Sequence, residues 1–234
     1  MSEGWRGRQA PPAEAGWDIV LRNIRERRSV RAFLDRPVAR ELIETVLEAA
    51  RWAPSGANAQ PWYVRVVTGA TKARITKALL EAREKGVREH PDYQYYPVEW
   101  FEPYKARRMG LGVAMYSTQG ARRNRAEFWN NNYRFFGAPV GLLFFIHKDL
   151  ATGSWMDYGM FIQNVMLAAR ALRLETCCQG SISDYPDEIR EILGIGPERL
   201  LTCAMSLGYP DWSAPINGFD RVRAQVTGFA VFHD

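Results

Sequence analysis

Two apolar segments in the second half of the chain limit the folds that it can adopt. Residues 140–146 form a continuous apolar run that is short enough for a strand buried on both faces. Residues 155–172 are apolar on nearly every side of a helix, which is typical of a helix at the centre of a protein. Both segments need other elements around them, so we expect a sheet packed against helices.

The remaining periodic segments complete this outline. Their spacing predicts helices over residues 17–27, 37–53, 71–82 and 186–193, and strands over residues 63–67, 200–207 and 229–232. Periodicity is weak between residues 86 and 136. Because strands and helices mix without regular β–α–β alternation, we expect an α+β architecture around one sheet.

The length of 234 residues suits one domain of ordinary size. Residues 1–16 are rich in Gly, Pro, Ala and charge, which predicts a flexible N-terminal arm, and residues 17–234 are predicted to form a single domain. Within it, residues 86–136 are interpreted as a variable segment that acts as a lid or an interface. The first residues lack the apolar core of a signal peptide, and no apolar run approaches the roughly 20 residues that span a bilayer.

Charge and cysteine content narrow the class of function. The 31 basic and 26 acidic residues leave a net charge of +5, and the basic residues do not interleave with aromatic ones as on nucleic-acid-binding faces. Cys177, Cys178 and Cys203 provide neither a disulfide framework nor the spacing of metal ligands. We therefore expect no nucleic acid, membrane or metal partner and a reducing, cytoplasmic location.

A basic segment follows the first predicted helix. Arg27, Arg28, Ser29 and Arg31 place three guanidinium groups and one hydroxyl within five residues. Guanidinium groups present a rigid fork of donors that matches phosphate oxygens. The segment therefore suits a bound phosphate, and a solvated basic turn is the alternative.

A second polar segment lies at residues 53–62 (APSGANAQPW). Two prolines and several small residues restrict this loop, while Ser55, Asn58 and Gln60 offer neutral hydrogen-bonding groups. Such a loop can approach a flat polar ring closely. An ordinary turn between a helix and a strand has the same composition, so this loop alone does not decide between the two interpretations.

Together, the two segments resemble the nitroreductase family, whose enzymes use flavin mononucleotide (FMN). That family is marked by an early Arg-Arg-Ser-x-Arg and a later Pro-Ser-x-x-Asn-x-Gln-Pro-Trp, and both occur here in the same order. The resemblance runs from about Trp17 to the C-terminus. It also includes the apolar helix from Trp155, the turn Cys178-Gln179-Gly180-Ser181 and the closing Arg221-Val222-Arg223. Residues 93–104 and Pro215-Ile216-Asn217 resemble the branch that reduces nitroaromatic compounds such as nitrobenzoate.

The resemblance implies an FMN site made from distant parts of the chain. The implied cofactor-binding residues are Arg27, Arg28, Ser29, Arg31, Arg221 and Arg223 at the phosphate and ribityl chain, Pro54, Ser55, Gly56 and Asn58 at the flavin of the other subunit, and Gln179 and Gly180 at flavin N5. Glycine at position 180 lets the main chain approach the ring. No catalytic side chain is assigned, because the flavin carries the hydride chemistry.

The resemblance also implies the fold and the activity. The fold would be a three-layer sandwich with a central, mostly antiparallel sheet flanked by helices, in an intertwined homodimer. The activity would be ping-pong hydride transfer through flavin N5, from NADH or NADPH to a nitroaromatic or quinone-like small acceptor. Reductive dehalogenation, other specialised flavin chemistry and a flavin-binding sensor without turnover are the alternatives on the same fold.

Two features remain open to more than one interpretation. Tyr95, Tyr96 and Trp100 lie in an aromatic segment that would stack flat acceptors as a lid, or pack as a contact between subunits. Cys177 and Cys178 stand where some relatives have proline and an aliphatic residue, and we interpret them as small buried apolar groups.

Overall fold

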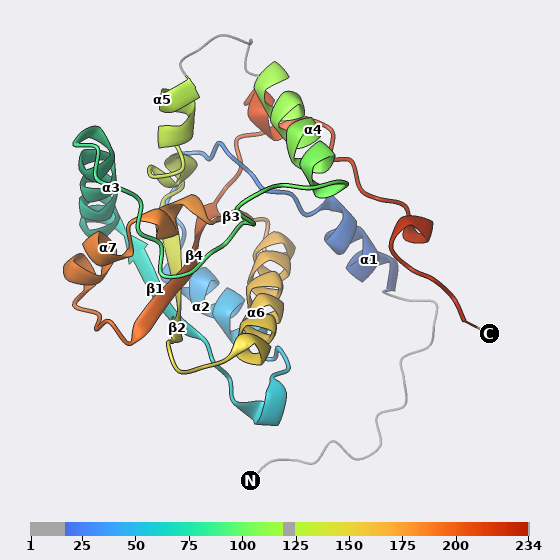
Figure 1. Ribbon diagram of the computed structural model, residues 1–234, viewed down its shortest axis with the longest axis horizontal. Coiled ribbons are helices and arrows are strands. Elements are labelled where there is room, and N and C mark those ends of the chain that lie inside the picture. Colours follow the sequence, from blue (N-terminus) through green and yellow to red (C-terminus); the bar gives the residue numbers. More distant parts are fainter. Residues whose placement is uncertain (1–16, 119–124, 234) are drawn as a thin grey trace.

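A four-stranded antiparallel sheet organises the chain (Figure 1), in the order β1-β2-β4-β3. The structure is a computed structural model that describes residues 17–118 and 125–233, so the predicted arm at residues 1–16 lies outside the described residues. The strands are β1 (Tyr63–Thr68), β2 (Val140–His147), β3 (Glu175–Gln179) and β4 (Arg199–Gly208). The expectation of an α+β fold with an antiparallel sheet is confirmed.

Helices cover both faces of the sheet. Helices α2 (Arg40–Ala50) and α6 (Thr152–Ala171) pack on one face, and α3 (Gly69–Glu84) and α7 (Pro186–Leu193) pack on the other. The other helices of the described residues are α1 (Trp17–Glu26), α4 (Tyr104–Ser117) and α5 (Arg125–Asn130). Short 3₁₀ turns lie at η1 (Gly56–Asn58), η2 (Phe135–Gly137), η3 (Ser181–Asp184), η4 (Pro215–Asn217) and η5 (Val226–Gly228). No helix in the described part of the chain has the length and apolarity that crossing a membrane requires.

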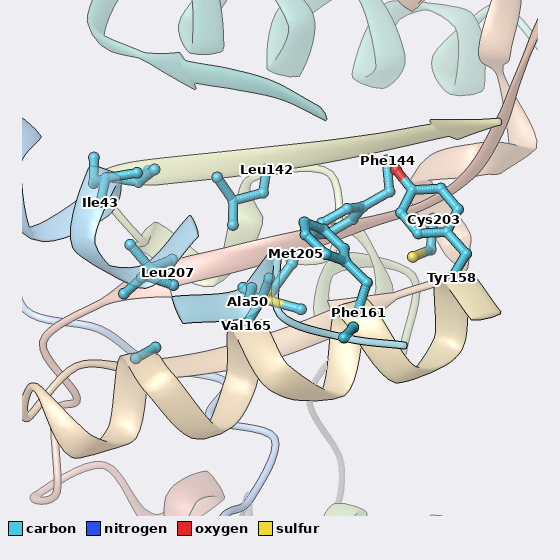
Figure 2. Packing of buried hydrophobic residues seen from close by; sticks show 14 of the residues in the cluster. Ile43, Ala50, Leu142, Phe144, Tyr158, Phe161, Val165, Cys203, Met205 and Leu207 are labelled. Carbon is cyan, nitrogen blue, oxygen red and sulfur yellow. The ribbon is translucent and has the colours of Figure 1, made fainter. Parts of the chain in front are cut away.

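The core forms on the two faces of β2 and β4. Successive residues of β2 point to opposite faces, so Leu142 and Phe144 pack with α2 and α6, while Leu143 and Phe145 pack with α3 and α7. Figure 2 shows Phe161 of α6 directed toward this first face. Each such side chain stabilises the fold by about 1.5–3 kcal/mol when fully buried. The apolar run of residues 140–146 is therefore a strand buried on both faces, as predicted.

The apolar helix α6 is buried on only one side. Tyr158, Phe161 and Val165 face the sheet and are buried, whereas Met156 and Met160 are 70% and 41% exposed. The expectation of a central buried helix is thus correct for one face alone. The opposite side of α6 therefore leaves apolar side chains exposed in the single chain.

Three features differ from the sequence-based outline. Strand β3 was not predicted, because it opens with Glu175, a charged residue that is buried here by pairing with Arg170. Helix α4 lies in the weakly periodic region and buries none of its residues, so it has no apolar stripe to detect. The strand predicted over residues 229–232 is wrong: this stretch is irregular, and Phe229 and Phe232 are exposed.

Candidate functional site

The edge strand β3 holds the basic segment in place. Ser29 forms a parallel bridge with Thr176, and the Val30 N–H donates to the Thr176 carbonyl at 3.0 Å. The Val30 side chain is completely buried, so the segment after α1 is anchored by both its backbone and its core contact. As a result, Arg27, Arg28 and Arg31 lie beside the outer edge of the sheet.

The far end of the chain returns to the same place. Figure 1 shows the C-terminal segment passing α1, where the Arg221 guanidinium donates to the carbonyls of Arg27 and Arg25. The Arg28 guanidinium donates to the Phe219 carbonyl at 2.5 Å. Basic residues from both ends of the sequence therefore meet in one cluster, as the resemblance implied.

Asn217 joins the C-terminal segment to the basic segment after α1 by hydrogen bonds. Its side chain is buried, its Oδ1 accepts the Arg31 N–H at 2.7 Å, and its Nδ2 donates to the Ala32 carbonyl at 2.9 Å. The resemblance of Pro215-Ile216-Asn217 to the nitroaromatic branch does not by itself predict this role. A backbone-positioning amide of this kind has no sequence signature of its own.

The guanidinium groups of the cluster repel one another. The pKa of Arg27 is lowered by burial and then by the charge of Arg223, and the pKa of Arg221 is lowered by burial and then by Arg28. The charged form of each guanidinium is therefore less stable in the cluster than in water. A bound dianion such as a phosphate monoester would relieve this repulsion, so the donor set fits the phosphate of FMN.

The opposite end of β3 carries the predicted turn. The buried Gln179 side chain donates to the Asn132 carbonyl at 2.7 Å and accepts the Ser206 hydroxyl at 2.6 Å, which fixes where the strand ends. Gly180 follows directly, and a Cβ on it would lie 3.6 Å from the Tyr95 ring. The main chain of Gly180 therefore faces an aromatic ring.

Two hydroxyl groups along this path lack partners. The buried Oγ atoms of Thr176, next to Ser29, and Ser181, next to Gly180, make no hydrogen bond within the described residues. An unpaired polar atom inside a protein costs about 1–3 kcal/mol. Hydroxyl donors left free near the two ends of β3 fit a polar ligand that extends along the strand.

The aromatic residues of the variable segment form a continuous cluster beside Gly180. The ring centroids of Tyr95 and Tyr96 lie 4.6 Å apart, and those of Tyr96 and Trp100 lie 5.4 Å apart. Tyr93 packs against Trp155 of α6 at 4.6 Å. The structure thus brings the three predicted substrate residues together, with Tyr95 and Tyr96 about half exposed.

The loop at residues 54–60 lies apart from these groups in the single chain. Its Gly56 N–H donates to the Asp157 carboxylate of α6 at 3.0 Å, and Pro54 and Asn58 are exposed. Ala57, Asn58 and Gln60 have positive φ angles of 51°, 54° and 49°, which non-glycine residues adopt only under constraint. Across the described residues, no hydrogen bond joins this loop to the basic cluster or to Gly180.

The cysteines form no disulfide. Cys177 is buried, and burial raises the pKa of its thiol to about 11. The Cys178 and Cys203 sulfur atoms lie 3.6 Å apart, and the Cys203 thiol lowers the pKa of Cys178 by hydrogen bonding to it. Cys177 and Cys203 are buried, and Cys178 is partly exposed where the core meets the turn at Gly180.

Comparisons with known proteins agree with this geometry. The sequence profile of the Nitroreductase family matches residues 24–209. The chain is 38% identical over 231 residues to the 4-nitrobenzoate reductase of Nocardioides sp. (strain LMS-CY), covering 95% of this chain and 92% of that protein. It is 36% identical over 215 residues to the chloronitrobenzene nitroreductase of Comamonas testosteroni, covering 89% and 94%.

A solved structure gives the same result. The crystal structure of the FMN and NADPH-dependent nitroreductase NfnB from Sphigopyxis sp. strain HMH matches with a TM-score of 0.89 at 34% identity. The match covers 92% of this chain and 99% of that chain.

Asp184, at the end of η3, should make stability depend on pH. Burial and then the charge of Glu89 raise its pKa to about 7, and the Tyr133 hydroxyl lies 3.3 Å from its carboxylate. Because the unfolded carboxyl has a pKa of about 4, the native state binds the proton more tightly. We expect the free energy of unfolding to fall as pH rises from about 4 through 7, and Asp184→Asn to remove that part of the slope. Urea unfolding of the native protein and of Asp184→Asn between pH 5 and 8 measures this difference in slope. Parallel pH profiles of the two proteins would contradict the raised pKa of Asp184.

Proposed function

The chain belongs to the nitroreductase family, and on that premise we propose that it is an FMN-dependent oxidoreductase that reduces nitroaromatic or quinone-like acceptors with NADH or NADPH. One observation carries the proposal: β3 links a basic cluster at one end to Gly180 beside exposed tyrosine rings at the other. Relatives named for nitrobenzoate and chloronitrobenzene match over nearly their whole length, which supports a small aromatic acceptor.

The residues along β3 suit the parts of FMN in order. Arg27, Arg28, Arg31, Arg221 and Arg223 supply the positive charge for the phosphate. Ser29 offers a hydroxyl beside the ribityl chain, and Gly180 lets the backbone approach the ring. When bound, FMN supplies the hydride chemistry of the reaction, so the chain needs no acid–base pair of its own.

The aromatic cluster supplies the surface for the acceptor. Tyr95 and Tyr96 present rings beside Gly180, and flat molecules stack favourably on such rings. These rings orient the acceptor and keep water away from it. We propose that one space serves a nicotinamide and an acceptor in turn, which gives a ping-pong cycle.

We further propose that the active unit is an intertwined homodimer. In the single chain, Ile19, Val20 and Ile24 of α1 are about half or more exposed, as are Met156 of α6 and Phe229 near the C-terminus. A second copy of the chain is a natural cover for these faces. The strained loop with Pro54, Ser55, Gly56 and Asn58 would then complete the flavin site of the partner.

The free cysteines support a reducing, cytoplasmic setting.

The proposed function has a direct test. We expect the purified protein to be yellow, to lose its flavin absorbance when NADPH or NADH is added without oxygen, and to regain it when 4-nitrobenzoate is added. Flavin that neither nicotinamide bleaches would instead indicate a binding protein without turnover. A colourless protein that takes up no added FMN would contradict the proposal.

Replacing one guanidinium of the cluster should weaken FMN binding. We expect Arg27→Gln to lose a charged hydrogen bond worth about 1.5–3 kcal/mol, which raises the dissociation constant about tenfold to 100-fold. Quenching of FMN fluorescence by the apoprotein measures this constant. Arg40→Gln is the matched control, because Arg40 is exposed on α2 and its ion pair within residues 17–118 and 125–233 is with Glu44. Equal affinities for both variants would contradict the assigned phosphate site.

A charge on the apolar face of α1 should weaken the dimer. We expect light scattering to give the native protein about twice the chain mass of 26.7 kDa. Val20→Glu should raise the dimer dissociation constant at least about tenfold, because a carboxylate in an apolar contact is costly to desolvate. Ala73→Glu, at an exposed position of α3, is the control. A native monomer that retains FMN, or equal dimerisation of both variants, would contradict the interface.

A further inference from the structure

Part of one edge of the central strand β4 is covered by no other strand among the described residues. Strand β3 ends at Gln179, opposite Ala204, whereas β4 begins five residues earlier at Arg199. Within this extension the register with β2 shifts between Phe144 and Phe145, so that Thr202 is an extra residue in β4. Such a bulge, like an open strand edge, leaves backbone groups that need other partners.

Side chains from two other segments supply those partners. The Asp92 carboxylate accepts the Leu201 N–H at 2.7 Å, and the Tyr93 hydroxyl donates to the Thr202 carbonyl at 2.5 Å. From α7, the Arg190 guanidinium donates to the Arg199 carbonyl at 3.1 Å. Tyr93, the first residue of the aromatic segment, and the preceding Asp92 are therefore attached to the sheet at the bulge.

A bidentate ion pair holds this attachment. The two Arg190 nitrogens donate to the two Asp92 oxygens at 2.7 and 2.9 Å, and the side chains are only 12% and 10% exposed. Arg190 also contacts Asp187 at 2.6 Å. The net stability from a buried pair is small, because desolvation offsets the attraction, but its geometry is specific. The pair therefore determines where residue 92 lies more than how stable the fold is.

The position of residue 92 determines where the neighbouring rings lie. Tyr93 is fixed at one side by the Thr202 carbonyl and at its ring by Trp155, at 4.6 Å. Tyr95 is two residues further and lies against Gly180. No hydrogen bond of the Tyr95 side chain is found among the described residues, so its position depends on the anchor before it.

We propose that the Asp92–Arg190 pair is a positioning element that, through Tyr93, holds the ring of Tyr95 beside Gly180 and so selects flat aromatic acceptors. The inference rests on the proposed function and names the residues that determine its acceptor preference. It assigns no catalytic role to either residue, because both act through the tyrosines.

Two acceptors of different shape test the selection. In a ping-pong reaction, kcat/KM for each acceptor reports on its own half of the cycle. We expect Arg190→Lys, which keeps the charge but loses the fork, and Asp92→Asn, which keeps the shape but loses the charge, to lower kcat/KM for 4-nitrobenzoate at least tenfold, mainly through KM. For ferricyanide, an anion without an aromatic face, the change should stay within twofold. Arg40→Lys, in the exposed pair with Glu44, should change neither value.

A second measurement does not depend on activity. In Arg190→Lys, the amide hydrogen exchange rate of Leu201, whose N–H is bonded to the Asp92 carboxylate, should rise at least tenfold, while the rates in β1 stay unchanged. Should Arg190→Lys fail to fold, Tyr93→Phe removes only the bond to Thr202 and should shift the acceptor preference in the same direction.

The outcomes separate the two proposals. Equal losses with both acceptors, or an unchanged exchange rate at Leu201, would overturn the positioning role. Native protein that binds FMN but reduces neither acceptor would contradict the proposed function, while the exchange experiment would still decide whether the pair anchors the segment.

Discussion

The hydrogen bond between the Val30 N–H and the Thr176 carbonyl is the contact on which the candidate site depends. It attaches the basic segment to the edge of β3, and the same strand ends at Gln179, where the backbone turns toward the aromatic rings. One short strand therefore sets both the charged and the aromatic end of the site. The C-terminal segment then closes the charged end through Asn217. A site built along one rigid element holds its distances better than a site built from separate loops.

Sequence reasoning identified the parts that follow local patterns. The apolar run at residues 140–146, the helices with one buried stripe and the two polar motifs all carry a signal within a few residues of chain. The missed strand β3 does not, because the burial of Glu175 depends on Arg170 from a different element. The anchor of the aromatic segment was missed for the same reason, since Asp92 and Arg190 lie 98 positions apart. The predicted basic cluster became recognisable only through the resemblance to a family.

The exposed apolar surface of the single chain is explained if another molecule covers it. Helix α6 buries one face against the sheet and leaves Met156 exposed, and α1 leaves Val20 exposed on its apolar side. A helix that is apolar on most sides is stable in water only when something covers it. The apolar pattern of such a helix indicates burial but does not say which chain provides the cover, and this is why the sequence predicted a central buried helix.

Because of the bulge in β4, the segment after Tyr93 can change in sequence without a change in the strands. Residues 92 and 93 are attached to the sheet by side chains at Leu201 and Thr202, whereas the strands themselves are joined by backbone ladders. Insertions and substitutions beyond Tyr93 therefore leave the ladder intact. We expect related proteins to differ in the acceptors that they reduce through changes in the segment after Tyr93. The basic cluster and β3 would stay the same in those proteins.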